Sequence, residues 1–197
     1  MKKLKSAICW EGDKVKGSRF VAHLTPLLSR SDASKNLTLL RERYFKATHV
    51  CFAWRLSDGS FLCSDDGEPK GSAGLPILRH LEGAELVDVL GVVVRFYGGT
   101  KLGVGGLIRA YGGALSQALK IADVAEFIPK KQINIEVLYP DYQKLISLCQ
   151  RHRIDILSIE FEARVRLKVC VPLRGLEAFL EETKNTACGR ITCLLED

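Results

Sequence analysis

The sequence predicts an α+β protein of two domains, residues 1–129 and 130–197. Three observations support this prediction. The first part contains two junctions in which a strand-like run is followed by a glycine-rich loop and then by a helical pattern. After residue 130 the patterns follow the order strand, helix, strand, strand, helix, strand. Between the two parts lies a basic, proline-containing joint at residues 128–131, where the pattern changes.

The elements of the first domain follow from short-range patterns. Alternation, β-branched content and turn residues predict strands at 7–10, 18–24, 48–56, 60–64 and 86–96. The Asp58-Gly59 dipeptide predicts that the third and fourth of these form a hairpin. Helical spacing and capping residues predict helices from Ser31 or Asp32 to about Phe45, from a Ser72 cap to Gly83, and over 107–119. The run 86–96 is almost entirely Val and Leu, which is typical of a strand buried on both faces.

The second domain alternates apolar and polar residues in a second set of elements. Strands are expected at 133–138, 154–161, 163–171 and 190–195, with helices beginning at Pro140 and covering 173–183. The order β-α-β-β-α-β is that of the ferredoxin-like fold. Arg164, Arg166 and Lys168 share one face of the third strand, which is either a solvated sheet face or a strip that binds RNA.

The composition is that of a globular protein, with 47% hydrophobic and 26% charged residues. The longest apolar runs have strand length and fall short of the about 20 residues that a membrane span needs. The basic start is followed by only four apolar residues, so we expect no signal peptide. Seven cysteines without a CxxC pair predict reduced thiols and a cytoplasmic protein. The net charge is +6 and resides mainly in residues 1–129, which favours an anionic partner such as RNA.

The first glycine-rich stretch, DDGEPKGSAGLPIL at 65–78, is open to three interpretations: capping of the following helix, a metal or acid–base site, or contact with a partner. Acids before a helix cap its free amides and stabilise its positive end. The same acids could instead hold a divalent cation, giving a metal-assisted hydrolase that uses His49, Asp66 and Glu68. No GxSxG, HExxH or CxxC motif accompanies them. We therefore expect no resident metal or cofactor and regard an enzyme as the alternative.

The second glycine-rich stretch, YGGTKLGVGGLIRAYGG at 97–113, contains the parts of an anion site. The start of a helix exposes unpaired amides, and glycines let a phosphate approach the backbone closely. It is neither a Walker A loop nor a Rossmann fingerprint, and its glycines could serve only tight turns and packing. The residues that we predict to bind an anion or nucleic acid are Ser72, Arg95, Gly98, Gly99, Thr100, Lys101, Gly105 and Arg109.

Four stretches also match a known family. SDDGEPKGSAGLPIL and VVVRFYGGTKLGVGGLIRAYGGAL, together with KGSRF at 16–20 and THVCFAWRL at 48–56, closely resemble the IMPACT family, in particular its bacterial YigZ-like members. The resemblance covers most of residues 1–125. It implies a first domain of the ribosomal-protein S5 domain 2 type. The second domain then resembles the last domain of elongation factor G, which works on the ribosome.

The resemblance also bears on function, since eukaryotic relatives regulate translation initiation. For the bacterial members it points to no particular reaction and to no catalytic residue. We therefore expect a cytoplasmic regulator of translation that binds RNA, the ribosome or another anionic ligand, together with protein partners of the translation machinery. A module that binds only proteins is the other alternative to an enzyme. No membrane partner is expected.

Overall fold

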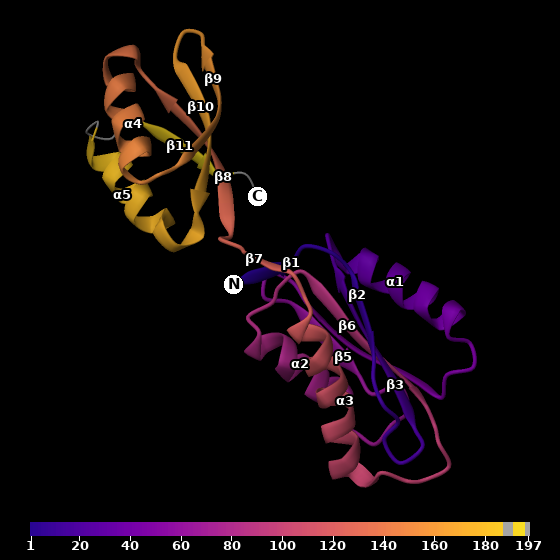
Figure 1. Ribbon diagram of the computed structural model, residues 1–197. Coiled ribbons are helices and arrows are strands. Elements are labelled where there is room, and N and C mark those ends of the chain that lie inside the picture. The colour runs from indigo at the N-terminus through magenta and orange to yellow at the C-terminus, as the bar shows by residue number, and fades with distance from the viewer. Residues whose placement is uncertain (187–190, 196–197) are drawn as a thin grey trace. The chain divides into compact units, whose positions relative to one another are not determined.

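The computed structural model describes residues 1–186 and 191–195, with the backbone alone for 192–195 (Figure 1). The chain divides into two compact units, residues 1–127 and 128–197. This division lies two residues before the boundary that the sequence pattern suggests. The described residues form strands and five α-helices in an α+β arrangement, and none of these helices is both long and apolar enough to cross a membrane.

The first unit is built on a five-stranded antiparallel sheet. Its strands, in spatial order, are β2 (Ile8–Glu11), β3 (Arg19–Pro26), β6 (Val89–Phe96), β4 (His49–Arg55) and β5 (Phe61–Ser64). The central β6 is buried along nearly its whole length, which confirms the prediction of a strand covered on both faces. Two short strands that the sequence analysis missed, β1 (Lys2–Leu4) and β7 (Val124–Glu126), pair with each other.

Three helices cover the two faces of this sheet (Figure 1). They are α1 (Arg30–Arg43), α2 (Gly74–Gly83) and α3 (Gly103–Lys120). Successive strand residues point to opposite faces. Ala22, Cys51 and Val93 therefore pack with α2 and α3, whereas Val21, Val50 and Val92 pack with α1. The sheet thus has a core on each side, and the starts of α2 and α3 both follow glycine-rich turns.

Both of these helices begin at residues that the sequence analysis did not expect. The cap predicted at Ser72 is wrong, because α2 begins at Gly74 after an Ala73 cap that has no side-chain hydrogen bond to the helix. Likewise α3 begins at Gly103, four residues before the first apolar position of its pattern. Glycine has poor helix propensity, so propensity alone places the start of α3 too late.

The second unit is a four-stranded antiparallel sheet with helices on one face. The strand order is β11 (Thr192–Leu195), β8 (Lys130–Val137), β10 (Val165–Pro172) and β9 (Asp155–Phe161). The helices are α4 (Tyr139–Arg151) and α5 (Leu176–Thr186), the latter preceded by the 3₁₀ turn η1 (Leu173–Gly175). The elements follow the predicted order β-α-β-β-α-β. Arg190, the first residue of the last predicted strand, lies outside the described residues.

Apolar residues on one face of this second sheet form its core. Ile133 and Ile135 of β8 pack with Leu167 and Val169 of β10, and Leu145 of α4 and Phe179 of α5 cover them. The other face of the sheet carries polar side chains. The five cysteines whose side chains are described form no disulfide with one another. Cys188 and Cys193 lie outside the described side chains.

Candidate anion site at the second glycine-rich turn

The amides that begin α2 are satisfied by the carboxylate of Asp65. Its Oδ1 accepts hydrogen bonds from the backbone N–H groups of Ala73 (2.9 Å) and Gly74 (2.8 Å), and its Oδ2 accepts one from Gly71 (2.8 Å). Burial raises the pKa of this carboxyl group, but the three amide hydrogen bonds outweigh it, and the net pKa is lowered. The start of α2 is therefore already occupied by an anion that belongs to the chain itself.

Asp66 ties the same turn to two other elements. Its Oδ1 accepts a hydrogen bond from Arg41 of α1 at 2.8 Å, and its Oδ2 accepts one from the backbone N–H of Val50 at 2.7 Å. Both carboxylate oxygens are thus engaged. The residue adopts a left-handed conformation with φ of 44°, which is uncommon outside glycine and is more readily adopted by aspartate. Asp66 therefore holds the turn against the sheet.

Glu68 is the third acid of the turn and lies in a buried polar cluster. Its side chain is 5% exposed, and its Oε1 accepts hydrogen bonds from Arg95 (2.6 Å) and Tyr111 of α3 (2.7 Å). His49 donates through Nδ1 to the Asp66 carbonyl (2.8 Å), and its Nε2 is 3.8 Å from the same Glu68 oxygen. Burial and nearby acidic groups raise the pKa of Tyr111, so its phenol stays protonated and donates.

His49, Asp66 and Glu68, the residues of the hydrolase alternative, therefore do come together. Their arrangement differs from that of a metal site, because the Glu68 carboxylate already neutralises the guanidinium of Arg95. Among the residues that the structure describes, no group of three or more His, Cys, Asp or Glu side chains is placed to hold a metal ion. The cluster has the contacts of a structural network that joins α3, β4, β6 and the first turn.

Two residues that the sequence analysis predicted to bind an anion, Ser72 and Arg95, are buried. Ser72 is fully buried, and its hydroxyl donates to the Pro69 carbonyl at 2.6 Å. Arg95 is 4% exposed and pairs with Glu68, so its charge is neutralised inside the protein. Neither side chain offers a free donor to solvent. Of the residues predicted to bind an anion, those that remain exposed all lie in the second glycine-rich stretch.

The second turn, residues 97–102, is fixed by close backbone packing. The hydroxyl oxygen of Ser18 accepts hydrogen bonds from the backbone N–H of Gly98 (3.2 Å) and from Arg95 (3.2 Å). A β-carbon on Gly98 would overlap the backbone of Gly17, so the two glycines allow the 15–18 turn to touch the 97–102 turn. Gly99, Thr100 and Lys101 follow, and all three are exposed. Sequence reasoning missed this pairing, although KGSRF was among the matched motifs.

The start of α3 differs from that of α2, because no side chain of the described residues caps it. Its N-cap is Leu102, which has no side-chain hydrogen bond to the helix, and its first turn contains no acidic residue. Gly103, Val104 and Gly105 are exposed. The first four amides of a helix have no partner within it, and they carry about half a positive charge. These amides therefore remain available to an external anion.

Basic side chains surround this helix start. Lys101 precedes it, Arg109 lies on its second turn, and Lys16 lies in the adjoining 15–18 turn. All three are exposed, and none has an ion-pair partner among the described residues. Lys16 and Arg109 also line a hollow of about 310 Å³ beside α3. The region thus combines free amides with free cations.

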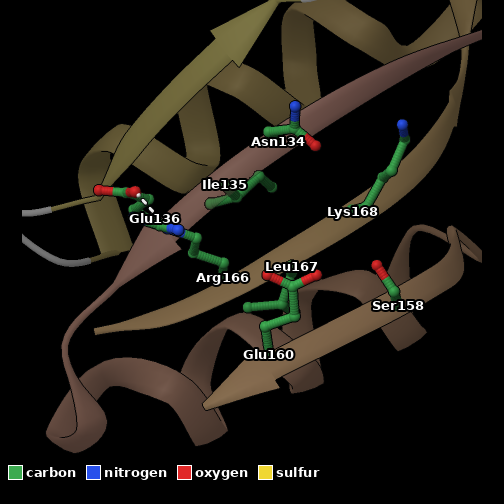
Figure 2. Close-up of a pocket in the computed structure, with 8 residues that line it drawn as sticks. All are labelled: Asn134, Ile135, Glu136, Ser158, Glu160, Arg166, Leu167 and Lys168. Carbon is green, nitrogen blue, oxygen red and sulfur yellow. Dashed lines mark hydrogen bonds and ion pairs between the residues drawn. The ribbon is translucent and has the colours of Figure 1, made fainter. Parts of the chain in front are cut away.

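A second hollow, of about 320 Å³, lies on the polar sheet face of the second unit (Figure 2). Side chains from β8, β9 and β10 line it, and Figure 2 shows the ion pair that Arg166 forms with Glu136 at 2.8 Å. Arg166 also pairs with Glu162, and Glu160 lies on the same face. The charges of this face are therefore balanced by neighbouring acids, as expected of the solvated sheet face rather than of a strip that binds phosphates.

Comparison with known proteins places the two glycine-rich turns in a recognised domain. Residues 16–119 match the family model described as the Impact N-terminal domain. The chain belongs to the IMPACT family. The matched range begins at Lys16 and includes both turns and most of α3, which are the elements that form the site.

Full-length relatives agree with this membership. The chain is 34% identical over 195 residues to an IMPACT family member of Haemophilus influenzae, covering 97% of this chain and 94% of the relative. It is 31% identical over 186 residues to the IMPACT family member YigZ of Escherichia coli, covering 92% and 91%. A crystal structure of a hypothetical protein matches with a TM-score of 0.67 at 28% identity, covering 100% of this chain and 97% of the other.

Proposed function

We propose that this IMPACT-family protein is a cytoplasmic RNA-binding protein that acts in translation, and that it binds RNA phosphates at the start of α3. The observation that carries the proposal is the contrast between the two glycine-rich turns. Asp65 accepts hydrogen bonds from the first amides of α2, whereas α3 has no acidic residue in its first turn and no side-chain cap from the part of the chain that the structure describes. The amides of α3 thus meet the requirement for a phosphate site at a helix terminus.

The distribution of charge supports the same assignment. Lys16, Lys101 and Arg109 bring three positive charges to the region, and no acid of the described residues pairs with them. Phosphate contacts of this kind release counterions from RNA, so the affinity falls steeply as salt is added. They also carry little sequence information. The proposed binding is therefore strong at low salt and tolerant of RNA sequence.

The fold assignments that the family resemblance implies are part of this proposal. The strand order β11-β8-β10-β9 and the element order β-α-β-β-α-β are those of a ferredoxin-like domain, which supports a second unit like the last domain of elongation factor G. A first unit of the ribosomal-protein S5 domain 2 type would complete the tandem. Such a tandem is consistent with the ribosome as the partner.

A charge reversal at Lys101 tests the proposal. The full chain and its Lys101→Glu variant are titrated with a fluorescein-labelled single-stranded 12-mer RNA at several salt concentrations, and binding is followed by anisotropy. We expect Lys101→Glu to weaken binding about tenfold at low salt and to reduce the slope of log affinity against log salt by about 1.

Lys120→Glu is the matched control. It makes the same charge change at the last residue of α3, 17 residues after Gly103, which corresponds to roughly 26 Å from the start of the helix at 1.5 Å per residue. This separation is about three times the screening length of about 8 Å at physiological salt, so at that salt the control should bind nearly as well as the wild type. Equal affinities for wild type and Lys101→Glu at low salt would remove the proposal. Capture of protein partners that survives nuclease treatment would then favour a protein-binding module.

A further inference from the structure

The hollow beside α3 has apolar walls, which a surface that binds only phosphates does not need. Its lining residues are Val15, Lys16, Leu102, Gly106, Arg109 and Ala110. Leu102, Gly106 and Ala110 are spaced four apart, so they form a strip along the side of the helix. Val15 and Lys16 face this strip from the 15–18 turn. The hollow is thus a space between two elements rather than the end of a helix.

The chemistry of the lining is divided between an apolar interior and a cationic rim. Val15, Leu102 and Ala110 provide apolar walls, and Val15 is 40% exposed although it has no polar side-chain group to solvate. Gly106 lines the hollow without a side chain, and a β-carbon added there would crowd Cβ of Leu102 at 3.2 Å. Lys16 and Arg109 contribute the charge, and no acidic residue lines the hollow.

We infer that the hollow receives one unpaired base of single-stranded RNA, with the phosphates beside that base bound by Lys16 and Arg109. This inference rests on the proposed function and names the form of RNA that it prefers. In an RNA strand a base has two flat apolar faces and is connected through its ribose to phosphates. The base matches the apolar walls of the hollow, and the phosphates match the cations beside them. A volume of about 310 Å³ is at the lower end of the about 300–1,000 Å³ of ligand pockets, which suits one base and excludes a duplex.

The alternatives fit less well. A duplex keeps its bases stacked inside, so it would meet the cations and leave the apolar walls unused. An acidic peptide would satisfy Lys16 and Arg109, but it does not join a flat apolar group to each negative charge as a nucleotide does. Arg109 favours the nucleotide further, because a guanidinium can stack on a base as well as bind a phosphate.

Filling the hollow without changing its charge tests the inference. We would measure the affinity of the full chain and its Gly106→Leu variant for a labelled single-stranded 12-mer RNA, for a duplex of the same length, and for adenosine monophosphate as competitor. We expect the wild type to prefer the single strand to the duplex. Gly106→Leu should lose about tenfold in affinity for the single strand, as expected when one stacked base is lost, with little change for the duplex. Adenosine monophosphate should displace the strand only weakly, because it lacks the neighbouring phosphates.

Gly113→Leu is the matched control. Gly113 lies in the same helix and is exposed, and a β-carbon added there would meet no neighbouring atom within 4 Å. It should leave both affinities unchanged. Should Gly106→Leu fail to fold by circular dichroism, Val15→Ser provides a second variant. It removes an apolar wall from an exposed turn whose hydrogen bonds with Ser18 are made by the backbone, and it should weaken single-strand binding.

The outcomes separate this inference from the proposed function. If Lys101→Glu weakens RNA binding but Gly106→Leu and Val15→Ser do not, the inference is wrong and the phosphate site remains. Equal loss of single-strand and duplex affinity in Gly106→Leu, or tighter wild-type binding to the duplex, would also overturn it. If the wild type binds neither RNA, the proposed function fails and this inference fails with it. Tight binding of adenosine monophosphate alone would identify a free nucleotide as the ligand and contradict the RNA assignment.

Discussion

Replacing Asp65 with alanine should destabilise the first unit more than replacing Asp66 with alanine. Glu68 is left out of this comparison, because its replacement leaves the buried charge of Arg95 without a partner. Its carboxylate accepts three backbone hydrogen bonds, at 2.8, 2.8 and 2.9 Å, from Gly71, Gly74 and Ala73. A hydrogen bond to a charged group contributes about 1.5–3 kcal/mol, but the three share one carboxylate and are not additive. Loss of a helix cap alone costs about 1–2 kcal/mol. We expect Asp65→Ala to lower the free energy of unfolding by about 3 kcal/mol.

Tryptophan fluorescence during urea unfolding is the assay, because both tryptophans of the chain, Trp10 and Trp54, lie in β2 and β4 of the first unit. The signal therefore reports on this unit and not on the second. Asp65→Asn should fall between the wild type and Asp65→Ala, since its amide oxygen can still accept but its NH₂ group cannot. The midpoint should move with little change in slope if folding stays two-state.

Asp58→Ala is the control, since Asp58 accepts its hydrogen bonds from Ser60 in an exposed turn, and this variant should leave the urea midpoint almost unchanged. The net pKa of Asp65 is lowered by folding, so its contribution is present above the unfolded value of about 3.9 and is lost as the pH falls through the folded value. The difference between wild type and Asp65→Ala should therefore shrink in acid. A loss in Asp65→Ala no larger than that of Asp58→Ala would refute the capping role.

Three further predictions concern the rest of the first unit. Glu68→Gln should cost about 3–5 kcal/mol in urea unfolding, because Arg95 would keep a buried charge without its counter-ion; a loss below about 1 kcal/mol would contradict the pairing. Burial, and to a smaller extent the charge of Arg43, lowers the pKa of His23 to about 4. Between pH about 4 and 6.5 the unfolded chain therefore binds more protons than the folded one, and the free energy of unfolding should rise with pH by at most about 1.4 kcal/mol per pH unit. A His23→Phe variant should lose this dependence. Gly98→Ala should destabilise strongly through backbone overlap, whereas Gly113→Ala should stabilise by about 0.5–1 kcal/mol; thermal melts that rank them in the opposite order would contradict the turn contact.

Much of the fold could be predicted because its signals are short in range. The Val- and Leu-rich run that became β6 and the apolar face of α3 depend on residues a few positions apart, and both were found from periodicity. The predicted cap at Ser72 failed for the opposite reason. A capping rule inspects the residue next to the helix, whereas the actual acceptor, Asp65, lies nine residues before Gly74. Only the folded turn brings it to the helix.

The candidate site was predicted in part for the same reason. Gly98, Gly99, Thr100, Lys101, Gly105 and Arg109 form one continuous stretch, and the structure places them around one helix start. The role of Arg95 could not be found, because its partner Glu68 is 27 residues away in the sequence. The contribution of Lys16 was equally hidden, since it depends on contact between two glycine turns that are 81 residues apart.

The central claim is that external phosphate meets the free amides of α3 and not the capped amides of α2. Amide chemical shifts of the ¹⁵N-labelled full chain, followed as single-stranded RNA is added, test it most directly. We predict the largest shifts at residues 98–106, with those at 71–74 unchanged. Shifts confined to 71–74, or to the sheet face around Arg166 and Lys168, would contradict the account.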